Sequence, residues 1–306
     1  MKKVLICATL VAMAFIGCKN RTTAPPQEPT DKRVAAQFTT GNVITRVADD
    51  AWEVGDKIGI FMSKNGHDEV TDRLENIVDG VENYPYEIAS SGLSSGSAKF
   101  SPSGFQKKEI FFPTDGSSVD FFAYHPYSSD LEGHTLDVDI SNQSSQTKLD
   151  LMWAKKDNHS MAAADVKLEF TRSLAKVEVK LAPGDGFTQD ALKDAKVTIE
   201  GVPTKASASI FDGKISSLST TDKVALVKKG EYGFEGILIP HTALAYNNRQ
   251  ISIELANGVK VNSPISEDIV AAKRRTYTVK VDKRATKFSM EITKWVDDDP
   301  IDLSTK

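Results

Sequence analysis

Apolar and polar residues alternate with a period of two along most of this chain, which is the spacing of a β-strand with one buried face. The alternation is clearest in KVEVKL, QISIEL, TYTVKVDK and KFSMEI, at residues 176–181, 250–255, 276–283 and 287–292. Shorter β-rich runs bounded by Gly, Pro, Asp or Ser lie at 56–61, 108–113, 119–126 and 194–202. The one weak helical signal is TQDALKDA at 188–195. We therefore expect an all-β protein of antiparallel sandwiches rather than βαβ units.

The start of the chain follows a different pattern. Lys2 and Lys3 precede the uncharged apolar stretch 4–17, which is short for a bilayer span and is typical of a secretory signal. The stretch ends in Gly17, a small residue, directly before Cys18. This order resembles the bacterial lipobox, in which the cysteine is lipidated and becomes the new N-terminus. An ordinary signal peptide with an incidental cysteine is the alternative.

Cysteine content and charge narrow the possible functions. Cleavage before Cys18 removes Cys7, so the mature chain is expected to have neither a disulfide framework nor a thiolate metal site. The formal net charge is −4, so no basic excess is present to hold a phosphate backbone, and we expect no nucleic-acid partner.

The distribution of strand signals predicts the domain organisation. Residues 1–17 are the predicted signal peptide, and the Pro-rich polar stretch 18–33 is a predicted flexible tether. A polar, then Ala-rich segment separates two strand-dense halves of ordinary domain size. We therefore expect an N-terminal β-sandwich over 34–160 and a C-terminal β-sandwich over 161–306.

Residues that could carry catalysis or bind a metal do not form a recognisable set. GLSSG at 92–96 fits the G-x-S-x-G pattern, but it lies in a Ser/Gly-rich stretch rather than between a strand and a helix, so we expect a loop. Asp137 and Asp139 share one face of a strand, as glycosidase acids do, but solvated carboxylates are the simpler expectation. The acidic run 296–300 lacks the spacing of a calcium loop.

Histidines and tryptophans also lack a functional pattern. No two histidines have ligand spacing, and all are expected at the surface or in turns: His67, His125, His134, His159 and His241. Among the aromatic residues that could stack on sugars, we expect Trp52 and Trp295 in the core and leave Trp153 open. We therefore predict no enzyme activity, no cofactor and no metal.

Several segments, in their order along the chain, resemble the fimbrillin-like lipoproteins of Bacteroidetes, the type V pilin group of major and minor fimbrial subunits. The segments are TRVADDAWEVGDKIGIFM, VDFFAYHPYS, DLMWAKK, LEFTRSLAKVEVKL and RTYTVKVDKRATKFSMEITKW, at 45–62, 119–128, 150–156, 168–181 and 275–295. Arg172 is a departure, because family members often have histidine there.

The resemblance implies two tandem transthyretin-like antiparallel β-sandwich domains and a precursor lipid-anchored at the outer membrane. It also implies cell-surface fimbriae and assembly with other fimbrial subunits by donor-strand exchange. In that process an outer protease cuts after a basic residue, the first strand leaves, and a strand of a neighbouring subunit fills the groove.

Arg46 is the candidate cut site, between the β-like segment 34–45 and the strand region that follows, with cleavage expected between Arg46 and Val47. A surface arginine in a turn is the alternative reading, and Arg33 is a weaker alternative cut site. The tail after Trp295 is a poor donor strand, so the donor is expected in the closing hairpin, or the protein is an accessory subunit.

The sequence is compatible with three functions. A structural or adhesive fimbrial subunit or accessory protein is favoured. The alternative is a solitary surface lipoprotein that binds glycan or host protein. Host or bacterial surface ligands are candidate partners. A secreted hydrolase is disfavoured, because no catalytic residues converge.

Overall fold

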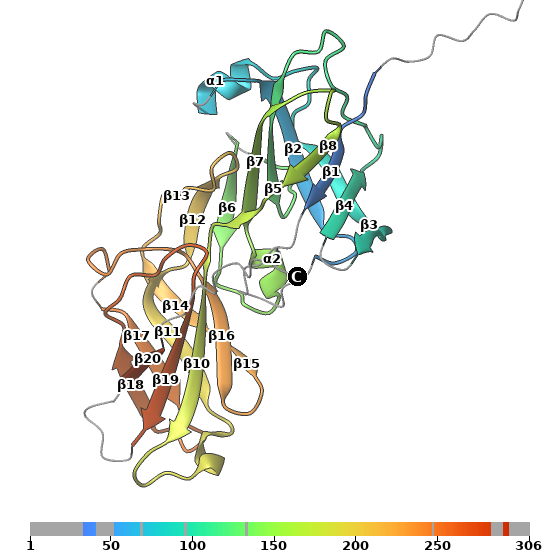
Figure 1. The fold of residues 1–306 in the computed structure, drawn as a ribbon. Coiled ribbons are helices and arrows are strands. Elements are labelled where there is room, and N and C mark those ends of the chain that lie inside the picture. The colour runs from blue at the N-terminus through green and yellow to red at the C-terminus, as the bar shows by residue number, and fades with distance from the viewer. Residues whose placement is uncertain are drawn as a thin grey trace, which may run out of the picture. The chain divides into compact units, whose positions relative to one another are not determined.

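The computed structural model describes residues 33–40, 52–67, 70–94, 97–131, 134–246, 248–282 and 290–293, whose course is shown in Figure 1. Strands predominate in these residues, which confirms the all-β prediction. The helical segments among them are short: α1 (Val70–Glu75), α2 (Gln146–Leu149) and the 3-10 helix η1 (Gln189–Leu192). The last of these lies where the sequence gives its weak helical signal.

Strands between residues 37 and 172 form an eight-stranded sheet in the order β8-β1-β4-β3-β2-β5-β7-β9. Their bounds are β1 (Gln37–Thr40), β2 (Lys57–Lys64), β3 (Tyr84–Ser94), β4 (Ser97–Pro102), β5 (Val119–His125), β7 (Met152–His159), β8 (Asp165–Leu168) and β9 (Thr171–Arg172). Neighbouring strands are antiparallel, except that β1 and β8 are parallel.

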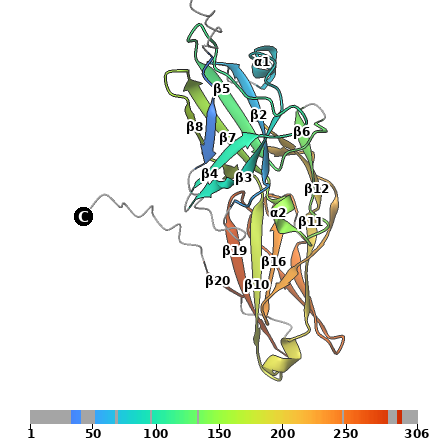
Figure 2. The ribbon, with the colours of Figure 1, turned by 90° about the vertical axis from the view of Figure 1, so that its right-hand side faces the viewer.

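Later strands form two further sheets, of five strands in the order β15-β16-β10-β19-β20 and of four in the order β14-β11-β17-β18. The bounds are β10 (Ala175–Pro183), β15 (Val227–Lys229), β16 (Gly233–Leu238), β19 (Arg274–Val281) and β20 (Met290–Thr293), then β11 (Lys196–Pro203), β14 (Thr221–Ala225), β17 (Gln250–Glu254) and β18 (Lys260–Pro264). The central strands β10 and β19 are parallel and remain in register from Lys176–Arg274 to Pro183–Val281. Figure 2 shows them side by side in a second view.

Two large hydrophobic clusters lie inside these sheets. One is built by buried side chains of the eight-stranded sheet, from Ala36 to Phe170. The other is built jointly by the five- and four-stranded sheets and runs from Val138 to Val281. The alternating apolar side chains of the strands build both clusters. In β17, for example, Ile251 and Ile253 are buried and their neighbours are half-buried.

A fourth sheet joins the two halves. It has three strands in the order β13-β12-β6, with β6 (Thr135–Asp139), β12 (Lys205–Ser209) and β13 (Ile215–Ser216). β6 comes from the first half of the chain and pairs antiparallel with β12 from the second. Two strands, β7 and β8, flank the expected boundary at residue 160, and both belong to the eight-stranded sheet. The domain boundary stays a prediction.

The turn between β12 and β13 covers the second face of the eight-stranded sheet. Ile210 and Phe211 in this turn form a small buried cluster with Phe61 of β2 and with Phe122 and Tyr124 of β5. The Phe211 ring meets the Phe61 ring edge to face at a centroid distance of 5.2 Å and the Phe122 ring at 5.4 Å. We call these five residues the hairpin cluster. Because both of its faces are covered, β5 is buried at every position.

Gly213 fixes how closely this turn approaches the sheet. Its φ is +65°, a region that side chains rarely adopt, and a Cβ atom there would overlap the ring of Trp153 on β7. A glycine is therefore required by both the backbone and the contact. The sequence did not indicate whether Trp153 lies in the core. In the structure it is half-buried beneath this turn.

Two local predictions differ from the structure. The run at 108–113 was predicted to be a strand, but it forms only an isolated bridge, between Phe111 and Ala35. Ile110 and Phe112 on either side are buried, so the apolar pattern reflects core packing, and Pro113 then ends the pairing. GLSSG was predicted to be a loop, but β3 extends into its first three residues, as far as Ser94, and residues 95 and 96 lie outside the described part of the chain.

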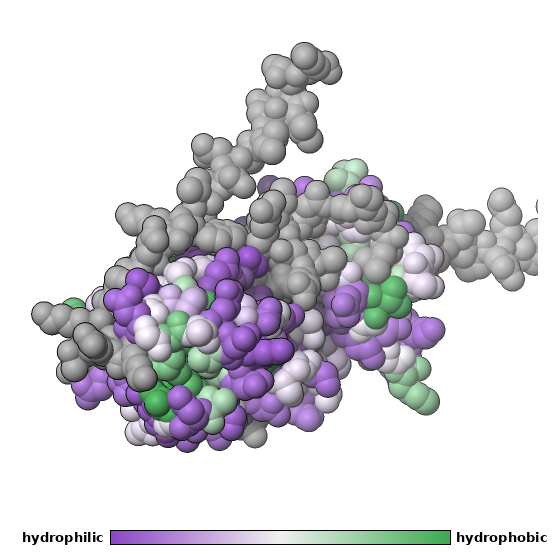
Figure 3. Space-filling model, turned by 90° about the horizontal axis from the view of Figure 1, so that it is seen from below, coloured by the Kyte–Doolittle hydropathy of each residue, from purple (hydrophilic) through white to green (hydrophobic). Residues whose placement is uncertain are grey.

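The exposed surface seen in Figure 3 is mostly hydrophilic, and hydrophobic residues gather in small patches on that face. Among the described residues, the exposed large hydrophobic side chains are Val54, Phe105, Leu218, Leu244, Val259 and Val270. Two of them stand out, because Phe105 and Leu244 are as accessible as in an extended peptide, at 104% and 97%. Trp52, by contrast, packs edge to face on Phe100 at 5.2 Å, as expected of a core residue.

Candidate functional site

The first strand, β1, is inserted between β8 and β4 of the eight-stranded sheet, one strand in from its edge. It pairs antiparallel with β4, where Thr39 lies opposite Lys99, and parallel with β8, where Phe38 lies opposite Val166. Just before the strand, the backbone N–H of Ala36 donates to the Ile110 carbonyl at 2.9 Å. The backbone groups of β1 are therefore shared between two strands that do not pair with each other.

One face of β1 fills the hydrophobic cluster of that sheet. Phe38 is completely buried, and its ring meets the rings of Tyr86 and Phe121 edge to face, each at 5.2 Å. Ala36 and Thr40, two residues away on either side, are buried on the same face. Without β1, the sheet would have an open groove centred on the Phe38 position.

The floor of this groove includes one hydroxyl group, which is buried and hydrogen-bonded. The phenol oxygen of Tyr86 accepts the backbone N–H of Ile110 at 2.9 Å. Burial raises the pKa of Tyr86 to about 12, so the phenol stays neutral at any physiological pH. A strand that enters the groove thus meets a neutral, mostly aromatic pocket.

The predicted lipidation and cleavage residues lie outside the described part of the chain. This holds for Cys18, Arg46 and Val47. Arg46 falls in the segment 41–51, between the end of β1 at Thr40 and the half-buried Trp52. A cut at Arg46 would therefore separate all of β1 from the rest of the fold.

Arg33, the weaker alternative cut site, lies before β1. It is exposed, and its guanidinium lies over the ring of Phe111, 4.3 Å from the centroid. Because Arg33 precedes β1, cleavage there would leave the strand attached to Arg46 and the remaining chain. The two sites therefore have opposite consequences for the groove.

The other end of the chain contributes an edge strand. β20 pairs antiparallel with β19, with Thr293 opposite Thr276, and it is the last strand of the five-stranded sheet. Trp295 and the acidic run 296–300 lie outside the described residues. An edge strand presents unpaired backbone groups, so this is a position at which another chain can add.

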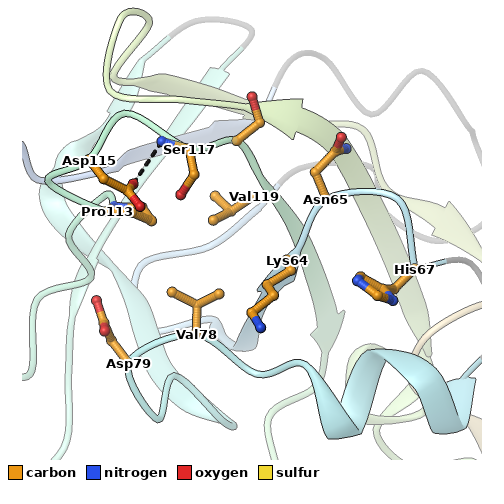
Figure 4. A pocket seen from close by; sticks show the side chains of 10 residues that line it. Lys64, Asn65, His67, Val78, Asp79, Pro113, Asp115, Ser117 and Val119 are labelled. Atoms are coloured by element: carbon orange, nitrogen blue, oxygen red, sulfur yellow. Dashed lines mark hydrogen bonds between the residues drawn. The ribbon is translucent and has the colours of Figure 1, made fainter.

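A shallow pocket of about 520 Å³ lies at the end of β2 and the start of β5. Figure 4 shows its lining, which joins Val78 and Val119 with polar groups from three segments. Lys64 makes no ion pair with any residue that the structure describes. Asp115 accepts the backbone N–H of Ser117 at 2.9 Å, and this hydrogen bond holds the pKa of the carboxyl below its usual value.

Two histidines expected at the surface are buried, so the prediction was wrong for them. His125 has a backbone contact from Nδ1 to the Lys57 carbonyl at 2.9 Å, and burial lowers its pKa. His241 Nδ1 is 2.7 Å from the Ile239 carbonyl, and Nε2 accepts from Arg249 at 3.2 Å. Burial also lowers the pKa of His241. Burial thus favours the neutral form of both imidazoles.

The remaining candidates for chemistry are dispersed. Asp137 and Asp139 are exposed on β6, and Asp139 lies 3.4 Å from the Lys205 ammonium. His134 pairs with Glu82 at 2.8 Å. In the part of the chain that the structure covers, no three His, Cys, Asp or Glu side chains are grouped to hold a metal ion. No helix among these residues is long and apolar enough to cross a membrane.

Comparisons with known proteins agree on one family. The family model described as fimbrillin-like matches residues 45–295. A Bacteroides uniformis protein assigned as fimbrium subunit Fim1C is 31% identical over 304 residues, covering 96% of this chain and 95% of its own.

Two solved structures have a similar fold. A crystal structure assigned as a cell adhesion protein from Bacteroides uniformis has a TM-score of 0.71 at 28% identity, covering 88% of this chain and 100% of its own. Another, from Bacteroides ovatus, has a TM-score of 0.64 at 17% identity, covering 88% of this chain and 99% of its own. The Bacteroides ovatus protein shares the fold of this chain.

Proposed function

The chain belongs to the fimbrillin-like family of fimbrial and cell-adhesion proteins, and we propose that it is a fimbrial subunit or accessory protein assembled by protease-triggered strand exchange. The observation that carries the proposal is the position of β1, inserted between β4 and β8 with Phe38 completely buried. A fimbrium subunit belongs to a cell-surface appendage. We further propose that the precursor is lipid-anchored at the outer membrane through Cys18.

The energetics of the groove favour its refilling after β1 leaves. Removal of β1 would leave the backbone groups of β4 and β8 without partners along one edge each. It would also uncover the pocket of Phe38, whose side chain alone buries about 200 Å². At about 25 cal/mol per Å², that residue contributes about 5 kcal/mol of apolar transfer before ordering costs. A strand with an aromatic residue in the same register satisfies both needs.

The closing hairpin contains a sequence that matches β1. Residues 35–39 read AAQFT, and residues 285–289 read ATKFS, with Phe288 at the position of Phe38. A neighbouring copy that inserts this segment would place an aromatic ring in the pocket, with Thr286 and Met290 at the positions of Ala36 and Thr40. This match supports the closing hairpin as the donor.

We also propose that the fold consists of two tandem transthyretin-like β-sandwiches, over 34–160 and 161–306. Its support is the division of the buried residues into two large clusters, one built by residues between 36 and 170 and the other mostly by residues between 174 and 281, with Val138, Ile140 and Leu151 as its members from the first range. By these bounds β1 and β4 lie in the first range, while β8, the other wall of the groove, and the donor segment lie in the second.

Cleavage by a trypsin-like protease between Arg46 and Val47 is expected to turn the monomer into an associating species. The cut frees β1, so the groove can accept a second copy. Size-exclusion chromatography and N-terminal sequencing after digestion measure both events. Arg46→Ala should abolish the cut and the association.

Two variants control this experiment. Arg33→Ala removes the site that precedes β1, and it should leave both events unchanged. Phe288→Ala should leave the cut unchanged and reduce the association. A cut chain that stays monomeric would contradict strand exchange and favour the solitary surface lipoprotein. The pocket at the end of β2 is then where a glycan or host-protein ligand would be sought.

Cys18→Ser is expected to release the protein from the membrane or leave an uncleaved precursor, because the thiol that receives the lipid is lost. Membrane fractionation and the mass of the N-terminal peptide report the result. Cys7→Ser is the matched control and should fractionate like the parent. Normal membrane retention and processing of Cys18→Ser would show that the chain has an ordinary signal peptide.

A further inference from the structure

The loop between β4 and β5 contains a tip, residues 104–109, in which every residue is exposed. Both ends of the tip are held by buried residues. Ser103 donates its backbone N–H to the Pro85 carbonyl at 2.9 Å, and Ile110 donates its own to the Tyr86 phenol at 2.9 Å. The tip is therefore a short projection fixed at its base by the fold.

The side chains of this tip combine one large aromatic ring with two positive charges. Phe105 is 104% exposed, and Lys107 and Lys108 follow it. Neither lysine forms an ion pair with a residue that the structure describes, although the Lys108 ammonium lies 5.2 Å from the centroid of the Tyr84 ring. Glu109 is the single acidic residue of the tip, so its net charge is positive in a chain whose total is −4.

The tip lies beside the place where the N-terminal segment leaves the fold. Val34 accepts the backbone N–H of Phe112 at 2.9 Å, and Ala36 donates to Ile110 at the same distance. The five residue steps from Ile110 back to Phe105 span at most about 18 Å. A chain that is anchored ahead of residue 33 would thus be tied down within reach of the exposed ring.

We propose that the 104–109 tip docks on an anionic phospholipid bilayer, with Phe105 in the interfacial region and Lys107 and Lys108 at the headgroups. An aromatic ring beside basic residues matches such a surface in both polarity and charge. The orienting effect rests on the proposed lipid anchor at Cys18, since the predicted tether 18–33 brings the tip to the membrane.

The tip would then act together with the anchor. Acyl chains hold the protein at the bilayer but leave it free to rotate about the tether. A second contact at the tip limits that rotation, so the first sandwich faces the membrane through the same edge each time. Docking of a second copy at Phe105 is the competing outcome, and it would appear as self-association without lipid.

Vesicle binding by the unlipidated chain tests the proposal without depending on the anchor. The probe is the chain from residue 18 with Cys18→Ser, which contains no other cysteine. Phe105→Cys in this background is labelled with an environment-sensitive fluorophore, and Leu244→Cys, at an equally exposed site, is the matched control. Anionic phosphatidylglycerol vesicles should shift the emission of the label at 105 to the blue and leave that at 244 unchanged.

Cosedimentation with the same vesicles at low salt measures the strength. Phe105→Ser should lower the partition coefficient about tenfold, which corresponds to losing the transfer of one aromatic side chain. Reversing both charges, Lys107→Glu with Lys108→Glu, should lower it at least about thirtyfold. Leu244→Ser should bind like the parent, and neutral phosphatidylcholine vesicles should bind far less.

Several outcomes would overturn the proposal. These are equal binding by Phe105→Ser and the parent, equal shifts of the two labels, or no binding to anionic vesicles at millimolar lipid. A concentration-dependent oligomer of the uncut parent that Phe105→Ser abolishes, without vesicle binding, would assign the tip to a contact between copies. Because these assays use uncut and unlipidated protein, they remain distinct from the tests of cleavage and of lipidation.

Discussion

Phe38→Ala is expected to lower the free energy of unfolding by about 3–5 kcal/mol, the range for deleting a fully buried aromatic side chain. The ring has no exposed surface, and it contacts Tyr86 and Phe121 edge to face. Its loss would leave a cavity in the centre of the groove, because β1 is held in place by strands on both sides. Urea unfolding of the uncut mature chain, followed by circular dichroism, measures the change.

Phe105→Ala is the matched control, since it deletes the same side chain at an exposed position. It should change stability by less than about 0.5 kcal/mol. The cut form of Phe38→Ala should also release residues 33–46 faster than the cut parent, because the aromatic side chain that fills the groove is missing. A destabilisation of Phe38→Ala no larger than that of the control would mean that β1 does not close the core.

Phe211→Ala is expected to have a comparable cost, about 3–5 kcal/mol, but for a different reason. Phe211 comes from the second half of the chain and packs on Phe61 and Phe122 of the eight-stranded sheet. Its truncation weakens the contact that joins the two halves. We therefore expect lower stability together with a loss of cooperativity between the two large clusters.

The measurement is urea unfolding followed in parallel by circular dichroism and by tryptophan fluorescence. Trp52 and Trp153 report on the eight-stranded sheet. The two curves should coincide for the parent and separate for Phe211→Ala. Leu244→Ala, an exposed site in the second half, should keep the curves together. Coincident curves and a loss below about 1 kcal/mol in Phe211→Ala would show that the hairpin cluster does not couple the halves.

The sequence predicted strands best where one face of the strand is buried and the other is more exposed. β10, β17 and β19 fall on the alternating runs, because each is covered on one side by its own core and faces a neighbour or solvent on the other. β5 could be recognised as a strand, but its burial on both faces could not be anticipated. That burial depends on Phe211, which follows β5 by more than 80 residues.

The candidate site was predictable only in part. The sequence showed a β-like segment before Arg46, and β1 is found within it. It could not show that this strand would lie between β4 and β8, because pairing partners far apart in the chain leave no periodic signal. It also missed the burial of His125 and His241. Each imidazole is near a backbone carbonyl that it can use in the core, and no local pattern reports that.

The parallel pairing of β10 with β19 determines how the protein would respond to mechanical tension. β10 follows directly after β9 of the eight-stranded sheet, and β19 leads to β20 at the other end of the described chain. A pull between the first sheet and the C-terminal segment would draw the start of β10 and the end of β19 in opposite directions. Because the two strands are parallel, that load runs along them and strains all their interstrand hydrogen bonds together instead of opening them one by one. A fibre built from such subunits would resist stretching through its longest parallel pair.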